Sequence, residues 1–447
     1  MQLPLSLLNS LEGLPGFSQE AFIHRHLEAD EMTSLRLNPA KKVQLPYSLQ
    51  PVPWSSLGYY VSPRPSFTFD PFFHAGCYYV QEASSMLLEQ AFLQLMPTNQ
   101  PLLALDFCAS PGGKTTHLYS LLAPGSVLVA NEVIKSRASL LRDNCIKWGT
   151  ESVVVTQNDP AHFRELPNFF DWITLDAPCS GSGLFRKDPA AINTWSADSV
   201  AHCAQRQQRI LAAAWQALKP GGILFYSTCS YSVEENEDII DWAQDQLGAS
   251  VLPVSINPSW GVIQGRVGYR CWPHWIRGEG FFFSCIRKPE SAVKAAGFKK
   301  GEKFSPLSTK ENERLKAWVH VEGQGLFEVG KQLHAWPISQ WEVLAFLKSK
   351  LYIHYAGVRM GEWMREKFIP DHALALSSLL TTHASAISLD KEQAISYLQR
   401  KELLLPLATR GWNKVTYDGF GLGWVNVLEG RINNYYPKEL RILKDKE

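Results

Sequence analysis

Short apolar runs alternate with amphipathic stretches through the middle of the chain. Runs typical of buried strands occupy residues 102–107, 126–131, 152–156, 172–175 and 223–227. Between them, apolar positions at helical spacing predict helices at residues 135–148 and 197–218. Alternation of this kind indicates parallel βαβ units, so we expect an α/β fold with a doubly wound sheet. A last strand at residues 280–286 is expected to close one edge of that sheet.

The flanking segments have different patterns. Residues 1–95 mix Pro, short apolar segments and aromatics, which predicts an N-terminal α+β extension ending in a helix at about 82–95. Residues 96–290 form the predicted α/β domain, residues 291–375 a linker or central domain, and residues 376–447 a C-terminal domain. In the C-terminal domain a helix at 391–400 precedes Gly-punctuated β runs, which indicates a small β-barrel-like module. These runs lie at 414–417, 423–428 and 431–435.

The composition is that of an ordinary globular protein. The 447 residues are 45% hydrophobic and 19% charged, and the net charge is +1. A basic footprint for nucleic acid must therefore be local. Residues 287–316 are rich in Lys, and this stretch is either a solvated linker or a phosphate-contacting segment.

The cysteines and the N-terminal segment bear on location. None of the eight cysteines forms a CxxC pair, and no His/Cys cluster has zinc spacing, so we expect reduced thiols and no metal site. Residues 1–22 lack the basic start of a secretory signal. No apolar run approaches the roughly 20 residues that span a bilayer. A cytoplasmic protein that does not bind membranes is expected.

A glycine-containing turn follows the first strand of the predicted sheet. It reads Cys108-Ala109-Ser110-Pro111-Gly112-Gly113-Lys114. Ser110 can cap the following helix, Pro111 can start it, and the two glycines allow close approach of a ligand. A P-loop would need Gly at position 108, and a dinucleotide fingerprint would need separated glycines, so neither motif is present.

Three acidic residues follow successive strands of the predicted sheet. Glu132 follows the second strand, Asp159 the third and Asp176 the fourth. Ligands of parallel sheets bind at this carboxyl edge, where Glu132 can accept hydrogen bonds from ribose hydroxyls. Like charges on one rim repel unless a cation compensates, and S-adenosylmethionine is a nucleoside with a cationic centre. Lys114 can balance the carboxylate of that cofactor.

Two cysteines follow strands that lead to the same crevice. Cys179 lies in Asp176-Ala177-Pro178-Cys179-Ser180 and Cys229 in Ser227-Thr228-Cys229-Ser230. After Cys229, the spacing of Ser232 and Glu235 predicts a capping box and a helix at 233–246. The positive end of that helix would favour a thiolate at Cys229.

A thiolate in this crevice suits methylation of a pyrimidine carbon. Carbon 5 of cytosine is a poor nucleophile, but a thiolate that adds to carbon 6 makes carbon 5 enamine-like and able to accept a methyl group. Asp176 is placed to hydrogen-bond nitrogen 3 during the addition. A base then removes the carbon 5 proton and the thiol is eliminated, a step that a second cysteine can assist.

These motifs resemble those of the Nol/Nop/Sun class of RNA cytosine-5 methyltransferases. Further similar segments are Gln81-Glu82-Ala83-Ser84-Ser85 and Gly280-Phe281-Phe282. The resemblance implies a Rossmann-like fold that uses S-adenosylmethionine, with Cys229 as nucleophile and Cys179 as the residue that aids product release. It also implies cofactor contacts from residues 108–114, Glu132, Asp159 and Asp176.

The C-terminal part is similar to the bacterial ribosomal RNA small subunit methyltransferase F group. The similar segments are Tyr355-Ala356-Gly357-Val358-Arg359-Met360-Gly361, Gly421-Leu422-Gly423-Trp424 and Asn433-Asn434-Tyr435-Tyr436-Pro437. This resemblance implies a PUA-like RNA-binding module and a cytosine of 16S rRNA as the target. Aromatic and basic residues of this region can stack bases and contact phosphates, although about half of the rings are expected in a core. They are Trp412, Tyr417, Trp424, Tyr435, Tyr436, Arg410, Lys414, Arg431 and Lys438.

Other functions remain open at this point. A tRNA cytosine-5 methyltransferase would use the same chemistry on another RNA. A non-catalytic ribosome-assembly factor would have no use for Cys229, Cys179 and the cofactor turn together. An amino-group methyltransferase would be expected to carry an aromatic residue at position 179. A monomer that binds RNA and not DNA is expected.

Overall fold

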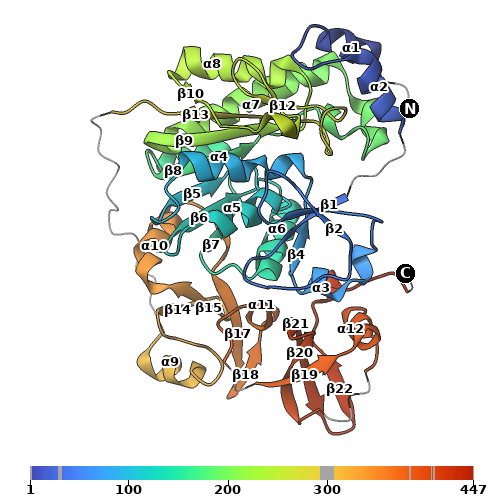
Figure 1. Ribbon diagram of the computed structural model, residues 1–447. Helices are drawn as coiled ribbons and strands as arrows, with labels where there is room; N and C mark the ends of the chain where they lie inside the picture. The colour runs from blue at the N-terminus through green and yellow to red at the C-terminus, as the bar shows by residue number, and fades with distance from the viewer. Residues whose placement is uncertain are drawn as a thin grey trace.

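The structure is a computed structural model that describes residues 3–28, 33–291, 307–381, 384–403, 405 and 408–445. Its centre is a large sheet with the strand order β11-β12-β13-β9-β8-β5-β6-β7-β16, and β10 pairs with β13 (Figure 1). The five parallel strands are β5 (Leu103–Asp106), β6 (Val127–Asn131), β7 (Val153–Thr156), β8 (Phe170–Asp176) and β9 (Leu218–Thr228). The predicted doubly wound α/β sheet is thereby confirmed.

Antiparallel strands extend this sheet at both edges. On one side lie β10 (Ser250–Leu252), β11 (Ile263–Gln264), β12 (Tyr269–Cys271) and β13 (Phe281–Arg287). At the other edge β16 (Ile353–Ala356), which comes from the predicted linker or central domain, pairs antiparallel with β7. Residues about 200 positions apart thus share one sheet.

Helices cover both faces of the sheet because alternate residues of each strand are apolar on either side. Ala104 faces a core that includes α4 (Leu88–Leu95), α5 (Gly113–Leu121) and α6 (Lys135–Trp148). Leu105 faces the opposite core with α7 (Ala197–Ala217), α8 (Glu237–Leu247) and α10 (Trp341–Lys350). No helix among the described residues is long and apolar enough to cross a membrane.

The N-terminal extension consists of two parts. Helices α1 (Leu5–Leu11) and α2 (Gln19–Leu27) pack with Phe22 against Tyr231 and Trp272 of the α/β domain. The second part is a four-stranded sheet with α3 (Pro71–His74) beside it. Its strands are β1 (Thr33–Leu37), β2 (Leu49–Pro51), β3 (Gly58–Val61) and β4 (Tyr78–Val80).

Two further four-stranded sheets follow the α/β domain. The first has the order β14-β15-β17-β18 and the second the order β19-β20-β21-β22. The first comprises β14 (Gln324–Val329), β15 (Gln332–Pro337), β17 (Val358–Met364) and β18 (Lys367–Pro370), with α9 (Thr309–Leu315) and α11 (His372–Leu376). The second comprises β19 (Ser385–Leu389), β20 (Gly411–Tyr417), β21 (Phe420–Leu428) and β22 (Arg431–Asn434), with α12 (Lys391–Leu398).

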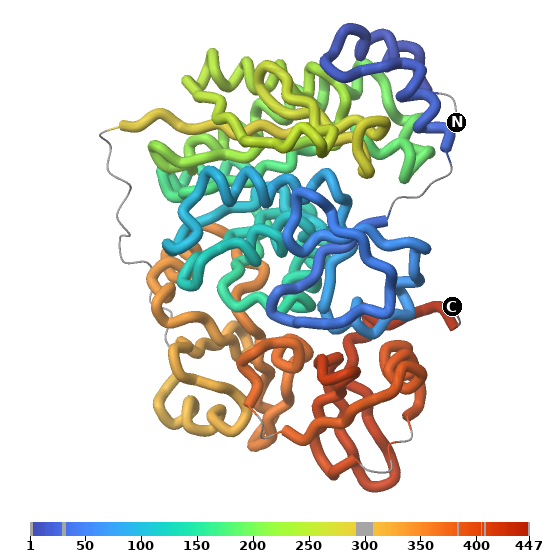
Figure 2. Tube along the Cα trace, viewed as in Figure 1, coloured from blue at the N-terminus to red at the C-terminus, as the bar shows by residue number. Residues whose placement is uncertain are grey.

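The N-terminal extension and the C-terminal sheet share a hydrophobic core. Phe72 and Tyr78 of the extension are buried together with Tyr397, Val425 and other residues from the end of the chain. The tube in Figure 2 shows the two segments side by side, although more than 300 residues separate them. The two ends of the chain therefore stabilise each other.

Candidate active site

The cofactor turn is fixed to α6 by hydrogen bonds. Gly112, with φ of 112°, is the residue before α5, and no side chain caps that helix. The expected capping by Ser110 is wrong, because its hydroxyl donates to Arg137 O at 3.0 Å and its carbonyl accepts from Arg137 Nη2 at 3.1 Å. Asn144 Nδ2 donates to Pro111 O at 2.8 Å. The backbone of the turn is thus held in place before any ligand binds.

Cys179 and Cys229 lie side by side although they are 50 residues apart. Their strands β8 and β9 are parallel neighbours, with Asp176 opposite Ser227, so both loops leave the same edge of the sheet. The two Sγ atoms are 3.2 Å apart. The hydrogen bond with Cys229, together with burial, raises the pKa of the Cys179 thiol well above its usual range. The protonated form of Cys179 is therefore favoured, and either sulfur can be the donor in this contact.

Glu235 joins the two cysteine loops. Its carboxylate accepts hydrogen bonds from Ser180 N at 2.7 Å, Ser180 Oγ at 2.6 Å and Ser230 Oγ at 2.5 Å. Burial raises the pKa of Glu235, and the bonds from Ser180 and Ser230 oppose that rise. The predicted capping box is wrong: Ser232 forms no side-chain cap, the turn Val233–Glu235 is a 3₁₀ helix, and α8 begins only at Glu237.

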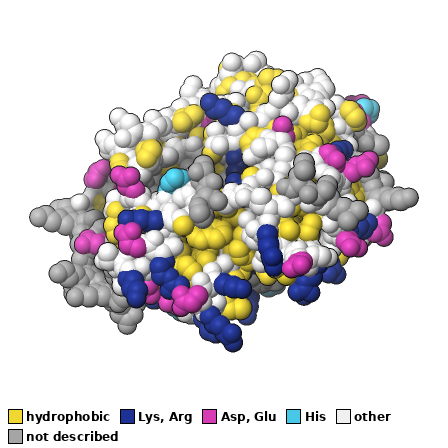
Figure 3. Space-filling model, turned by 90° about the horizontal axis from the view of Figure 1, so that it is seen from below, with side chains coloured by type: hydrophobic (Ala, Val, Ile, Leu, Met, Phe, Trp, Pro, Cys, Tyr) yellow, Lys and Arg dark blue, Asp and Glu magenta, His cyan; other side chains and the backbone are white. Residues whose placement is uncertain are grey.

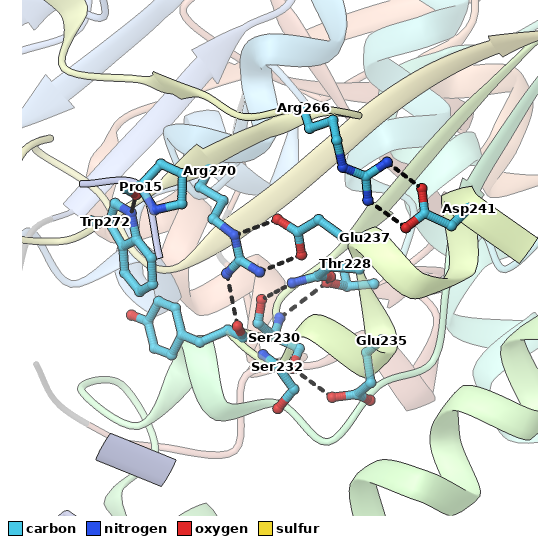
Figure 4. Close-up of polar contacts among 12 residues, drawn as sticks. Pro15, Thr228, Ser230, Ser232, Glu235, Glu237, Asp241, Arg266, Arg270 and Trp272 are labelled. Atoms are coloured by element: carbon cyan, nitrogen blue, oxygen red, sulfur yellow. Dashed lines mark hydrogen bonds and ion pairs between the residues drawn. The ribbon is translucent and has the colours of Figure 1, made fainter. Parts of the chain in front are cut away.

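The loop after Cys229 is anchored from the other side by Arg270 of β12 (Figure 4). Arg270 Nη1 donates to Tyr231 O at 2.7 Å, and its Nε donates to Glu237 Oε1 at 2.6 Å. Thr228 Oγ1 donates to Asn236 Oδ1 at 2.5 Å, and Asn236 Nδ2 donates to Ser230 O at 2.8 Å. The backbone on both sides of Cys229 is thus fixed by buried polar contacts.

A glycine lets the two loops approach each other closely. Gly183 N donates to Cys229 O at 2.8 Å, and Gly280 N donates to Gly183 O at 3.2 Å. A Cβ at position 183 would lie 2.7 Å from Cys229 O and 2.6 Å from Gly280 O. Any larger residue at this position would push the Cys229 loop outward.

Asp176 is paired on both of its oxygens. Its Oδ1 accepts from Ser227 Oγ at 2.8 Å, and its Oδ2 lies 2.8 Å from Lys114 Nζ. Burial opposes the charge on Lys114, but the attraction of Asp176 outweighs it and the pKa of Lys114 is raised. Lys114 is thus an ion-pair partner of Asp176, and its expected role in balancing a cofactor carboxylate stays a prediction.

A hollow of about 360 Å³, called here the active hollow, brings most of the predicted residues together. Cys229, Asp176 and Lys114 line it with all of the cofactor turn except Gly112. Cys179, Glu132 and Asp159 are not among its described lining, although Cys179 lies directly beside Cys229. Glu132 accepts from Ile134 N at 3.1 Å, and Asp159 accepts from Ala161 N at 2.9 Å. Both follow adjacent strands farther along the same sheet edge.

Asp106 is a site residue to which the sequence pattern gave no role. It ends β5, lines the active hollow and accepts from Thr115 Oγ1 at 2.6 Å. Its other oxygen, Oδ1, is buried and has no hydrogen-bond partner among the described residues. Burial raises the pKa of Asp106 to about 7. Its position at the end of a strand, as for Asp176, was the signal that could have identified it.

Two more acids line the active hollow: Glu82, from a segment quoted only for its resemblance, and Glu279, which directly precedes another such segment. Glu82 accepts from Glu279 N and from Ser85 N, both at 2.9 Å. Burial raises the pKa of Glu279, and the Arg186 guanidinium at 3.4 Å opposes this. Acidic groups thus surround Cys229 on several sides.

The site has the properties that the predicted cofactor requires. The buried Asp106 Oδ1 without a partner and the row of acids suit a ligand with a positive centre. The turn at residues 108–114 offers backbone groups, and Glu132 and Asp159 extend the same edge by two strands. The residues present therefore fit S-adenosylmethionine. Their individual roles stay predictions.

Other predicted features are not part of this site. Lys294, Lys299, Lys300 and Lys303 of the Lys-rich segment lie outside the described residues. Lys288 donates to Trp215 O and Leu218 O at 2.8 and 2.7 Å. Within the described parts of the chain, no group of three or more His, Cys, Asp or Glu residues is arranged to hold a metal ion.

Comparison with known proteins identifies the family. A model of 16S rRNA methyltransferase RsmB/F matches residues 92–287, one of the N-terminal domain of 16S rRNA methyltransferase RsmF matches 3–83, and one of the methyltransferase RsmF PUA domain matches 384–442. Ribosomal RNA small subunit methyltransferase F of Aeromonas hydrophila is 32% identical over 459 residues, which covers 94% of this chain and 95% of the relative. The chain belongs to the ribosomal RNA small subunit methyltransferase F family. The resemblance found in the sequence and the predicted PUA-like module are confirmed.

Other members and solved structures agree with this assignment. The methyltransferase F of Aliivibrio fischeri (strain MJ11) is 31% identical over 414 residues, covering 88% of this chain and 86% of the relative. The crystal structure of a methyltransferase homolog from Pyrococcus horikoshii is 30% identical with a TM-score of 0.51, and it covers 64% of this chain and 100% of that chain. The similarity thus extends over the α/β domain and beyond it.

Proposed function

We propose that this protein transfers a methyl group from S-adenosylmethionine to carbon 5 of a cytosine in 16S rRNA, through a transient bond between Cys229 and the base. The observation that carries the proposal is the position of Cys229, which lines the active hollow with the cofactor turn and whose Sγ lies 3.2 Å from Cys179 Sγ. The cofactor supplies the methyl group when bound.

The side chains of the site divide the reaction into steps that they can assist. The Cys229 sulfur adds to carbon 6 while a proton shared between Asp176 and nitrogen 3 stabilises the negative charge that develops on the ring. Lys114, 2.8 Å from Asp176, keeps that carboxyl group in place. After carbon 5 has gained the methyl group, a base accepts its proton and the Cys229 sulfur leaves as a thiolate. Cys179, the neighbour of Cys229, assists this last step.

RNA recognition is assigned to the parts outside the α/β domain. Figure 3 views the molecule from the end that carries residues 307–445 in Figure 1, and Lys and Arg side chains surround an apolar area on that face. Apolar surface next to cations suits a nucleic acid, because bases stack on rings and phosphates attract cations. The C-terminal PUA-like sheet is the expected RNA-binding module. We expect a cytoplasmic monomer that acts on rRNA or on the assembled small subunit.

The decisive experiment compares cysteine variants on three substrates: 16S rRNA, small ribosomal subunits and tRNA. Cys229→Ala should abolish methyl incorporation into 16S rRNA or small subunits, because alanine has no nucleophile, while the affinity for S-adenosylmethionine stays within about twofold. Cys179→Ala should accumulate a covalent protein–RNA band on a denaturing gel. Cys203→Ala, on the half-buried surface of α7, is the matched control and should retain activity.

Two outcomes would contradict the proposal. Methylation by Cys229→Ala at the normal rate would exclude the thiol adduct. Incorporation confined to tRNA would retain the chemistry but exclude 16S rRNA as the substrate. Mapping of the methylated base in RNA with and without the protein identifies the target nucleotide.

A further inference from the structure

A second hollow lies beside the active hollow and has no role in the reaction described above. It encloses about 430 Å³, within the range of about 300–1,000 Å³ of small-molecule sites. Its described lining comes from three parts of the chain: the N-terminal extension, α6 and the C-terminal segments. The rings of Phe67, Phe73, Tyr79 and Tyr436 are part of this lining.

The two hollows share a wall. Tyr79 and Val80, at the end of β4, line both of them. Asn144 lines the second hollow and donates to the carbonyl of Pro111, which lines the active hollow. The two hollows are therefore adjacent, on either side of Tyr79 and Val80.

The second hollow combines aromatic rings with cations and polar groups. Lys147 Nζ lies 3.8 Å from the centre of the Phe73 ring, and Arg64 Cζ lies 5.6 Å from the centre of the Phe67 ring. Asp143 and Asn144 place a carboxylate and an amide on the same lining. Rings can stack a base, the carboxylate and amide can hydrogen-bond its edge, and cations can approach a phosphate.

We propose that this second hollow is a subsite for the base of a nucleotide directly next to the target cytosine. The inference rests on the proposed function, because a cytosine that enters the active hollow must leave its stack. The neighbouring base then loses a stacking partner, and the aromatic rings of the adjacent hollow replace that partner. The substrate recognised here is single-stranded RNA with at least two consecutive unstacked bases.

The test uses two changes. A larger protein side chain fills the hollow, and an abasic site in the RNA removes the base that is proposed to occupy it. Leu140 lines the hollow and is 49% exposed, so Leu140→Trp adds volume without removing a core contact. Leu93→Trp on α4, where the leucine is 45% exposed and is not part of that lining, is the matched control. The probe is an rRNA fragment that contains the cytosine to be methylated, either intact or with an abasic site at one neighbouring nucleotide. Fluorescence anisotropy gives the Kd of each fragment.

We expect that Leu140→Trp and an abasic neighbour each weaken RNA binding, and that the two losses are not additive when combined. In the wild type, an abasic site at one of the two neighbours should raise Kd between about 5-fold and about 150-fold, since stacking of one base is worth about 1–3 kcal/mol. Leu140→Trp should raise the Kd of intact RNA by a similar factor, and in that variant the abasic site should have no further effect. Leu93→Trp should behave as wild type.

Three results would overturn the proposal. They are an unchanged RNA affinity in Leu140→Trp, an unchanged affinity for RNA with an abasic neighbour, and two losses that add fully. A protein occupant would give the first result with naked RNA and a loss with assembled subunits. Should Leu140→Trp fail to fold, Leu440→Trp fills the hollow from the C-terminal segment. Binding is read without catalysis, so a failure here differs from absent methylation by the wild type.

Discussion

Glu235→Ala removes the carboxylate that joins the two cysteine loops. Four hydrogen bonds end on this carboxylate: two from Ser180 and one from Ser230 at 2.5–2.7 Å, and one from Gln207 Nε2 at 3.4 Å. Bonds to a charged acceptor are worth about 1.5–3 kcal/mol each, but bonds that share one acceptor are not additive. Relief of the burial that raises the pKa of Glu235 offsets part of the loss. We therefore expect the free energy of unfolding to fall by about 3 kcal/mol.

The activity of Glu235→Ala should fall more than its stability suggests. The loops that carry Cys179 and Cys229 would no longer be tied at Ser180 and Ser230, and a shift of about 1 Å in a reacting group can cost 10²-fold in rate. We expect kcat to drop by about that factor while the affinity for S-adenosylmethionine is unchanged. Urea unfolding, single-turnover methylation and calorimetric cofactor titration measure the three quantities.

A matched control is available at the neighbouring position. Glu234 is exposed and contributes no hydrogen bond to either cysteine loop, so Glu234→Ala should leave stability and kcat unchanged. Glu235→Gln keeps one carbonyl acceptor for Ser180 N and should lie between the two. The reasoning is refuted if the free energy of unfolding of Glu235→Ala lies within about 0.5 kcal/mol of the wild-type value and its kcat stays within twofold.

Two further predictions concern close packing and pH. Gly183→Ala places a Cβ against the carbonyls of Cys229 and Gly280, and we expect a loss of about 1–3 kcal/mol and slower methylation. Gly265→Ala, where the nearest atom is 3.4 Å away, is the control, and equal stability of the two variants would contradict the prediction. Burial lowers the pKa of His74, His334 and His372 to about 4. Because these histidines bind protons more readily when unfolded, stability should fall as pH drops from about 6.5 to 4, by about 3 kcal/mol per residue. A flat urea midpoint over that range would contradict this.

The central sheet could be predicted because its strands are local signals. Five apolar runs overlap β5 to β9, and their alternation with helices predicts a parallel sheet before any contact is known. The pairing of β16 with β7 and the core shared by the chain ends were not predictable in this way. They depend on contacts between residues some 200 to more than 300 positions apart, for which the sequence carries no local pattern.

The site shows the same division. The positions of Cys179 and Cys229 after strands placed both thiols at one edge, and the structure brings them to 3.2 Å. Glu235 was interpreted as a capping residue because its spacing from Ser232 fits that motif. Its actual partners include Ser180, 55 positions away, and a short-range motif cannot reveal such a competitor. Asp106 received no role because its burial, the cause of its raised pKa, emerges only in three dimensions.

The core common to both ends of the chain has a mechanical consequence. Phe72 and Tyr78 cannot separate from Tyr397 and Val425 without exposing that core to water, so the last module is not a loosely tethered clamp. An RNA segment bound by the C-terminal module would therefore lie at a constant distance from the Cys229 sulfur. This fixed distance selects RNAs by their shape. An RNA whose fold does not match the distance cannot place its cytosine at Cys229.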